Sequence, residues 1–96
     1  MKTLFVILPV DYAMSDEAEQ LERMLSLFLH RRNIAHTSRD YWDDGEYDTE
    51  YGVRLDISEP IDDDSFLLLL GGIVYTTSLL YGSIRIQLDG NCVINV

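Results

Sequence analysis

Carboxylates are the residues of this chain whose number and spacing could do chemistry. They gather between residues 40 and 64, a window that contains eleven acidic residues and one base, Arg54. The acidic residues are Asp40, Asp43, Asp44, Glu46, Asp48, Glu50, Asp56, Glu59, Asp62, Asp63 and Asp64. Eleven acids against one base give this window a net charge of -10, which equals the net charge of all 96 residues. The charge is therefore a local feature.

Metal binding is the first chemistry that such a window could support. Five of its residues match positions 1, 5, 6, 7 and 9 of an EF-hand calcium loop: Asp40, Asp44, Gly45, Glu46 and Asp48. Trp42 and Tyr51, however, stand where the motif needs an Asp or Asn and a bidentate Glu. We therefore expect no metal site and no cofactor, and keep a divalent-metal-binding protein as an alternative.

Catalytic signatures are missing from the sequence. It contains no P-loop, GxSxG, HExxH or CxxC motif, and the positions of His30 and His36 indicate no pairing with Cys92 or with a serine. Two carboxylates will lie close together wherever so many are present, so their proximity alone does not indicate general acid and base catalysis. We predict that the protein is not an enzyme.

The spacing of the acids favours a binding surface. If residues 44–51 are extended, every second residue of this acidic stretch projects from one face at intervals of about 6.8 Å, similar to the phosphates of a nucleic-acid strand. Asp56 and Asp62–Asp64 could add a second row, and the aromatic rings could anchor a partner. The predicted partner-binding residues are Asp40, Trp42, Asp43, Asp44, Glu46, Tyr47, Asp48, Glu50, Asp56, Asp62, Asp63 and Asp64.

The elements that must position this surface start with a strand and a helix. The continuous apolar run Lys2–Val10 predicts a central strand covered on both faces, ended by Pro9. Residues 15–33 predict an amphipathic helix, capped by Ser15 and terminated by Asn33 in the left-handed conformation. Its apolar stripe is Ala18, Leu21, Met24, Leu25, Phe28 and Leu29.

The second half of the chain predicts a hairpin and one ambiguous segment. Residues 34–42 and 53–57 form the hairpin, whose tip is acidic, and residues 84–88 and 92–96 form two final strands. Residues 66–81 fit a helix that begins after Asp62 and stops at Gly82. They also fit two strands around Gly71 and Gly72, because two glycines inside a helix cost roughly 2 kcal/mol.

These elements predict a single α+β domain over residues 1–96, an antiparallel sheet packed by one or two helices, with an acidic hairpin at 40–64. With a helix at 66–81 the order is βαββαββ, a ferredoxin-like sandwich with an added C-terminal strand. Otherwise one helix packs on a larger sheet. A segment as apolar as residues 66–81 is hard to bury within a chain of 96 residues. We therefore expect a homodimer that forms through this segment.

The composition of the chain limits which partners it can bind and where in the cell we expect it. An acidic surface repels nucleic acid and anionic lipid, so we expect neither direct nucleic-acid binding nor membrane insertion. The apolar run 66–81 is 16 residues, shorter than the roughly 20 of a membrane span. One cysteine, Cys92, and no secretory signal predict a cytoplasmic protein.

In size and in the gathering of its charge, the chain resembles the small phage-encoded inhibitors that imitate DNA, including anti-CRISPR proteins. The resemblance implies a viral protein that acts in the host cytoplasm, without catalysis, by occupying the basic groove of a CRISPR effector, a restriction enzyme or a similar nucleic-acid-binding protein. The alternative is a structural or assembly module that dimerises through its apolar C-terminal half.

Overall fold

The computed structural model of the chain describes residues 2–45, 49–58, 60–88 and 91–95, the last range by its backbone alone. A short 3₁₀ turn, Val10–Tyr12, joins the first strand to the first helix. In chain order the elements are β1 (Lys2–Ile7), α1 (Ser15–Arg31), β2 (His36–Asp44), β3 (Thr49–Ile57), α2 (Asp63–Tyr81), β4 (Arg85–Leu88) and β5 (Asn91–Asn95).

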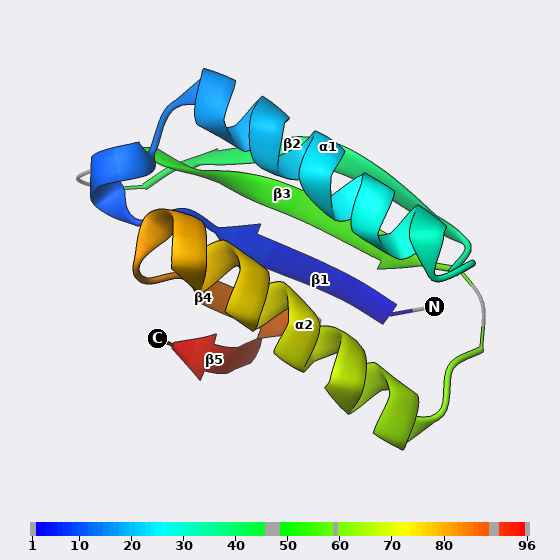
Figure 1. Cartoon of the computed structure of the whole chain (residues 1–96). Coiled ribbons are helices and arrows are strands. Elements are labelled where there is room, and N and C mark those ends of the chain that lie inside the picture. Colours follow the sequence, from blue (N-terminus) through cyan, green and yellow to red (C-terminus); the bar gives the residue numbers. More distant parts are fainter. Residues whose placement is uncertain (1, 46–48, 59, 89–90, 96) are drawn as a thin grey trace.

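The five strands form one sheet in the order β2-β3-β1-β4-β5, and every neighbouring pair is antiparallel. Figure 1 shows both helices on the same face of this sheet, α1 along β2 and β3, and α2 along β1 and β4. The predicted α+β class is confirmed. The order of elements and strands resembles a ferredoxin-like sandwich in which β5 extends one edge.

The hydrophobic core lies between the sheet and the two helices. Alternate residues of the inner strands point toward the helices, because side chains alternate along a strand. The core side chains of the strands are Leu4, Val6, Val53, Leu55, Ile57 and Ile86, and those of α1 are Ala18, Leu21, Leu25 and Leu29. The apolar stripe predicted for α1 is thus confirmed, with Met24 and Phe28 half-buried at its border.

The ends of α1 differ in how well the sequence predicted them. Asn33 has a φ of 56°, so the left-handed residue predicted after the helix is confirmed. The predicted cap is wrong: Ser15 is already helical, and the N-cap residue is Met14, which provides no side-chain hydrogen bond. The exposed ion pair between Arg23 and Glu19 spans one helical turn at 3.7 Å.

The segment that was ambiguous in sequence is a helix, α2. Asp62 caps its first turn by accepting a hydrogen bond from the backbone N–H of Ser65 at 3.1 Å, and Gly82, with a φ of 81°, ends it. A Cβ atom at Gly72 would lie 2.7 Å from Cζ of Phe28, so this glycine lets the two helices approach. By length and composition alone α2 could cross a membrane, a test that core helices of soluble proteins also pass.

The predicted central position of β1 is confirmed, whereas the prediction that β1 is covered on both faces is wrong, because helices cover only one face of the sheet. Phe5 and Ile7 made β1 look continuously apolar, but they point away from the helices. Ile7 is only 5% exposed although it lies outside the core cluster between sheet and helices. Side chains of neighbouring strands therefore cover Ile7. The apolar sequence pattern had suggested that a second layer of the fold would cover this face.

Candidate functional site

The hairpin of β2 and β3 divides its carboxylates between the two faces of the sheet. Asp43 pairs with Glu50 and Asp44 pairs with Thr49. Directly paired residues share a face and successive residues alternate, so Asp44 and Glu50 point to opposite faces. The predicted single row of charge is therefore wrong for these two residues, and Glu46, Tyr47 and Asp48 lie outside the described residues.

The second predicted row is also divided. Asp56 lies inside β3, where it is bonded to its neighbours. Asp62 caps α2, and Asp63 and Asp64 begin it, at the end of the molecule opposite the point where β2 ends and β3 begins (Figure 1). These three acids stabilise the positive end of the helix dipole. The acidic residues of the window therefore do not form one continuous surface in the described part of the chain.

The face of the sheet that points away from the helices is called the open face here. Its orientation is fixed by β2, because His36 is 3.1 Å from Ser26 of α1 and Ser38 donates a hydrogen bond to Glu22 of α1 at 2.7 Å. The alternate residues must point the other way. The open face comprises Thr3, Phe5, Ile7, Thr37, Arg39, Tyr41, Asp43, Glu50, Gly52, Arg54, Asp56, Arg85 and Gln87.

An aromatic pair occupies the centre of the open face. The ring centroids of Phe5 on β1 and Tyr41 on β2 are 4.9 Å apart, with the ring planes tilted by 58°. These strands are not neighbours, because β3 lies between them. The residue of β3 paired with both Tyr41 and Ile7 is Gly52, which has no side chain, so the ring of Tyr41 can extend across β3.

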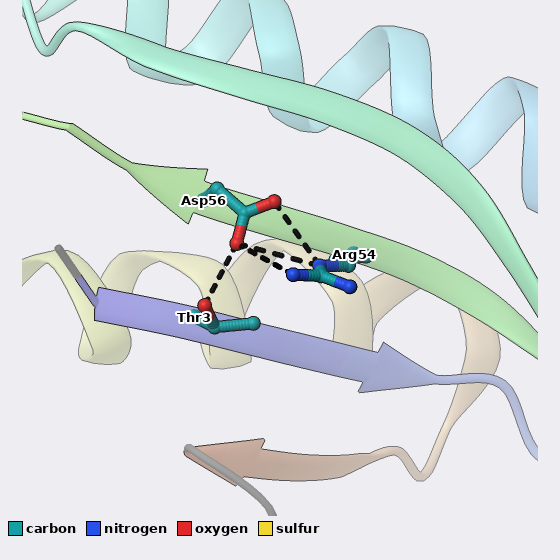
Figure 2. A network of polar contacts seen from close by, with 3 residues as sticks. All are labelled: Thr3, Arg54 and Asp56. Atoms are coloured by element: carbon teal, nitrogen blue, oxygen red, sulfur yellow. Dashed lines mark hydrogen bonds and ion pairs between the residues drawn. The ribbon is translucent and has the colours of Figure 1, made fainter.

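One end of the open face is an internally bonded polar network, drawn in Figure 2. Arg54 donates to Asp56 at 3.1 Å, and the hydroxyl of Thr3 donates to the same carboxylate at 2.7 Å. The hydrogen bond from Thr3 and the charge of Arg54 hold the pKa of Asp56 below its ordinary value. The guanidinium of Arg54 also lies 5.7 Å from the ring centroid of Phe5. This network rigidifies the face.

The other end of the open face carries two opposed carboxylates. Asp43 and Glu50 are directly paired across β2 and β3, an arrangement in which like charges destabilise a sheet. Arg85 of β4 donates to Glu50 and so offsets part of this repulsion, while Asp43 is exposed. Burial, followed by the charges of Asp43 and Glu50, raises the pKa of Tyr41.

This acidic end has the chemistry of an organic-cation site. Aromatic rings attract cations through their π faces, and the two carboxylates add negative charge beside the ring of Tyr41. The side chain of Arg85 is 36% exposed, so its guanidinium can still donate to an acceptor on a ligand. The arrangement therefore suits a small molecule with a cationic centre and a carboxylate.

Other kinds of site find less support. Among the described residues, no group of three or more His, Cys, Asp and Glu could hold a metal ion. Asp40 and Asp44 both belong to strand β2, so they do not lie in a calcium loop. A hollow of about 520 Å³ also lies between the end of α1 and the start of α2. Most of the described residues that line it are apolar, among them Phe28, Ile61 and Leu69, so it lacks the clustered carboxylates of the open face.

No motif in the sequence links Phe5, Gly52, Arg54 and Arg85. The alternation of residues 37–43 and 50–56 is a signal for the faces of two strands. The register that pairs Asp43 with Glu50 was missed, because the sequence predicted strands over 34–42 and 53–57, whereas β2 extends to Asp44 and β3 begins at Thr49. Trp42, predicted as an anchor, lies on the helix side of β2 and is 60% exposed.

Comparisons with known proteins bear on the fold. No family model matches the chain, and no curated protein matches it. A solved structure of a phage SAM lyase in its apo state is similar, with a TM-score of 0.51 and 15% sequence identity. The match covers 99% of this chain and 84% of that chain. At this identity the likeness establishes a shared fold over almost the whole length of the protein.

Proposed function

We propose that the open face binds a small sulfonium compound of the S-adenosylmethionine class. The observation that carries this proposal is the pair of opposed carboxylates, Asp43 and Glu50, beside the ring of Tyr41. A sulfonium has no N–H group to donate, so its recognition depends on aromatic faces and nearby negative charge. A bound cation would also relieve the repulsion that Arg85 offsets only in part.

The remaining groups of S-adenosylmethionine find counterparts on the same face. Its adenine can stack on the rings of Phe5 and Tyr41, and its carboxylate can accept a hydrogen bond from the partly exposed guanidinium of Arg85. The solved structure of similar fold is named a SAM lyase, which supports the choice of ligand without assigning it.

Isothermal titration with S-adenosylmethionine and with S-adenosylhomocysteine tests the proposal, because the second compound lacks the positive charge. We expect the sulfonium to bind at least about tenfold more tightly. Asp43→Asn should weaken its binding by about tenfold, whereas Asp40→Asn should leave it unchanged. Asp40 is the matched control because it is exposed on the same strand but points to the other face. Equal binding of both compounds would rule out the cation site.

The prediction that this protein is not an enzyme can be tested in the same mixtures. Chromatography after incubation would separate intact S-adenosylmethionine from its cleavage products. We expect the ligand to be recovered intact. Recovery of a cleaved adenosyl thioether, abolished by Asp43→Asn, would contradict this prediction and extend the proposal to the lyase reaction named for the structural neighbour.

A second candidate is the stoichiometric inhibitor suggested by the acidic hairpin. The observation that favours it is the 60% exposed indole of Trp42, which is flanked on the same side of β2 by the exposed carboxylates Asp40 and Asp44. An exposed aromatic anchor within negative charge suits a groove lined by Lys and Arg, as in a nucleic-acid-binding protein.

Affinity capture from host lysate at low and high salt tests this candidate. We expect a nucleic-acid-binding protein to be retained at low salt and lost at high salt. Asp40→Asn with Asp44→Asn should abolish its capture. Asp63→Asn with Asp64→Asn is the control, because it removes the same charge at the opposite end of the molecule. Equal loss with both double variants would indicate a nonspecific effect of net charge.

A further inference from the structure

The outer side of α2 presents an apolar stripe. Leu67, Gly71, Tyr75 and Leu79 follow one another at intervals of four residues, which places them on one ridge of the helix. Leu67 is 64% exposed, Tyr75 67% and Leu79 69%. Leu68, three residues before Gly71, adjoins the ridge and is 79% exposed.

The size of this stripe is that of an interface. Its four large side chains together expose on the order of 500 Å² of surface, so two copies joined here would bury roughly 1,000 Å² in total, the lower limit for a specific interface. Single exposed leucines are ordinary on soluble proteins, but a continuous apolar patch of this size marks a site of association. The stripe therefore needs an occupant.

Charge favours a second copy of this chain as that occupant. No Asp, Glu, Lys or Arg occurs between Ser65 and Ile84, whereas the whole chain carries a net charge of -10. Two identical acidic proteins repel each other wherever carboxylates would meet, and α2 is a long surface where they would not. The same charge disfavours contact with an anionic membrane.

The two adjacent glycines of α2 have different surroundings: Gly72 contacts another part of the same chain, whereas Gly71 faces open space. Gly72 is required by the chain itself, since its Cβ would meet the ring of Phe28. A Cβ at Gly71 would meet nothing within 4 Å, so the fold of one copy does not require a glycine there. Glycine inside a helix costs about 1 kcal/mol relative to alanine, and a second helix in close contact would explain its presence.

We propose that two copies associate through an antiparallel contact of their α2 helices, with the two-fold axis close to Gly71. Because Leu67 and Tyr75 lie four residues on either side of Gly71, the axis brings Leu67 of one copy against Tyr75 of the partner copy. Ridges of this spacing pack with helix axes crossing at about -50°. The open face stays free, because it lies on the other side of the sheet.

Sedimentation equilibrium over a range of protein concentrations tests the contact. The wild type should show a monomer–dimer equilibrium. Gly71→Gln should raise the dimer dissociation constant at least tenfold, because the longer side chain separates the helices. The melting temperature of dilute Gly71→Gln should not fall, since the site is open and glutamine favours a helix.

Leu27→Gln is the matched control. It removes another exposed leucine, 48% exposed on α1, and should leave the dimer unchanged. A wild type that stays monomeric at all concentrations, or a dimer that Gly71→Gln does not weaken, would overturn the proposal. A monomer that floats with neutral phosphatidylcholine vesicles would overturn it in favour of a membrane surface.

Discussion

Gly52 of β3 lies so close to the backbone of β1 that a Cβ atom there would overlap the carbonyl oxygen of Val6. A side chain cannot be accommodated by moving a flexible neighbour, because the obstacle is the backbone of the central strand. We expect Gly52→Ala to lower the free energy of unfolding by about 2–3 kcal/mol, as measured by urea denaturation. Thr37→Ala, an exposed change on the same face, should alter it by less than about 0.5 kcal/mol. Equal effects would contradict the tight strand contact.

The network of Thr3, Arg54 and Asp56 predicts a dependence of stability on pH. Because the pKa of Asp56 is lowered in the folded protein, its contribution is complete above the unfolded value of about 3.9 and is lost as pH falls through the folded value. Asp56→Asn should therefore destabilise the protein by about 1–2 kcal/mol at pH 7 and by progressively less below pH 4. Urea denaturation at several pH values measures this difference, and a constant difference would show that ionisation plays no part.

Arg85 should stabilise the fold because it offsets the repulsion between Asp43 and Glu50. Its ion pair with Glu50 is over a third exposed, so Arg85→Ala should cost no more than about 1 kcal/mol in the wild type. The cost should be smaller in an Asp43→Asn background, where less repulsion remains. A double-mutant cycle of the wild type, the two single variants and the double variant measures this coupling. Equal costs of Arg85→Ala in both backgrounds would show that Arg85 does not offset the repulsion between Asp43 and Glu50.

The cap of α2 provides a prediction at the opposite end of the molecule. Asp62→Ala should lower the melting temperature, because the N–H of Ser65 loses its acceptor. Asp62→Ser retains an acceptor and should restore most of the loss. Circular dichroism during heating measures both variants. A serine variant as unstable as the alanine variant would mean that charge at the helix start matters more than the hydrogen bond.

Periodicity in the sequence predicted the α+β class, the first helix and the hairpin. It left residues 66–81 open because two glycines argue against a helix when only local propensity is considered. Gly72 is explained by a contact with Phe28, more than forty residues away in sequence, and such tertiary contacts are invisible to local patterns.

The site was harder to predict than the fold. Clustering of acids along the sequence suggested one surface, yet Asp43 and Asp44 point to opposite faces and Asp62 lies at the far end of the molecule. The open face combines residues from four strands, and its aromatic pair spans two strands separated by a third. Strand order and register, which no motif in this chain specifies, decide which of these residues meet.

The exposed edge of β2 has a consequence for aggregation. An edge strand carries backbone N–H and C=O groups that can template the addition of further strands, and β2 forms one edge of this sheet. Asp40, Asp43 and Asp44 are exposed along it, so pairing β2 with the same strand of another molecule would align carboxylates with carboxylates. The acidity of this strand therefore works as a gatekeeper against fibre-like growth at neutral pH. Protonation of these side chains in acid would remove that protection.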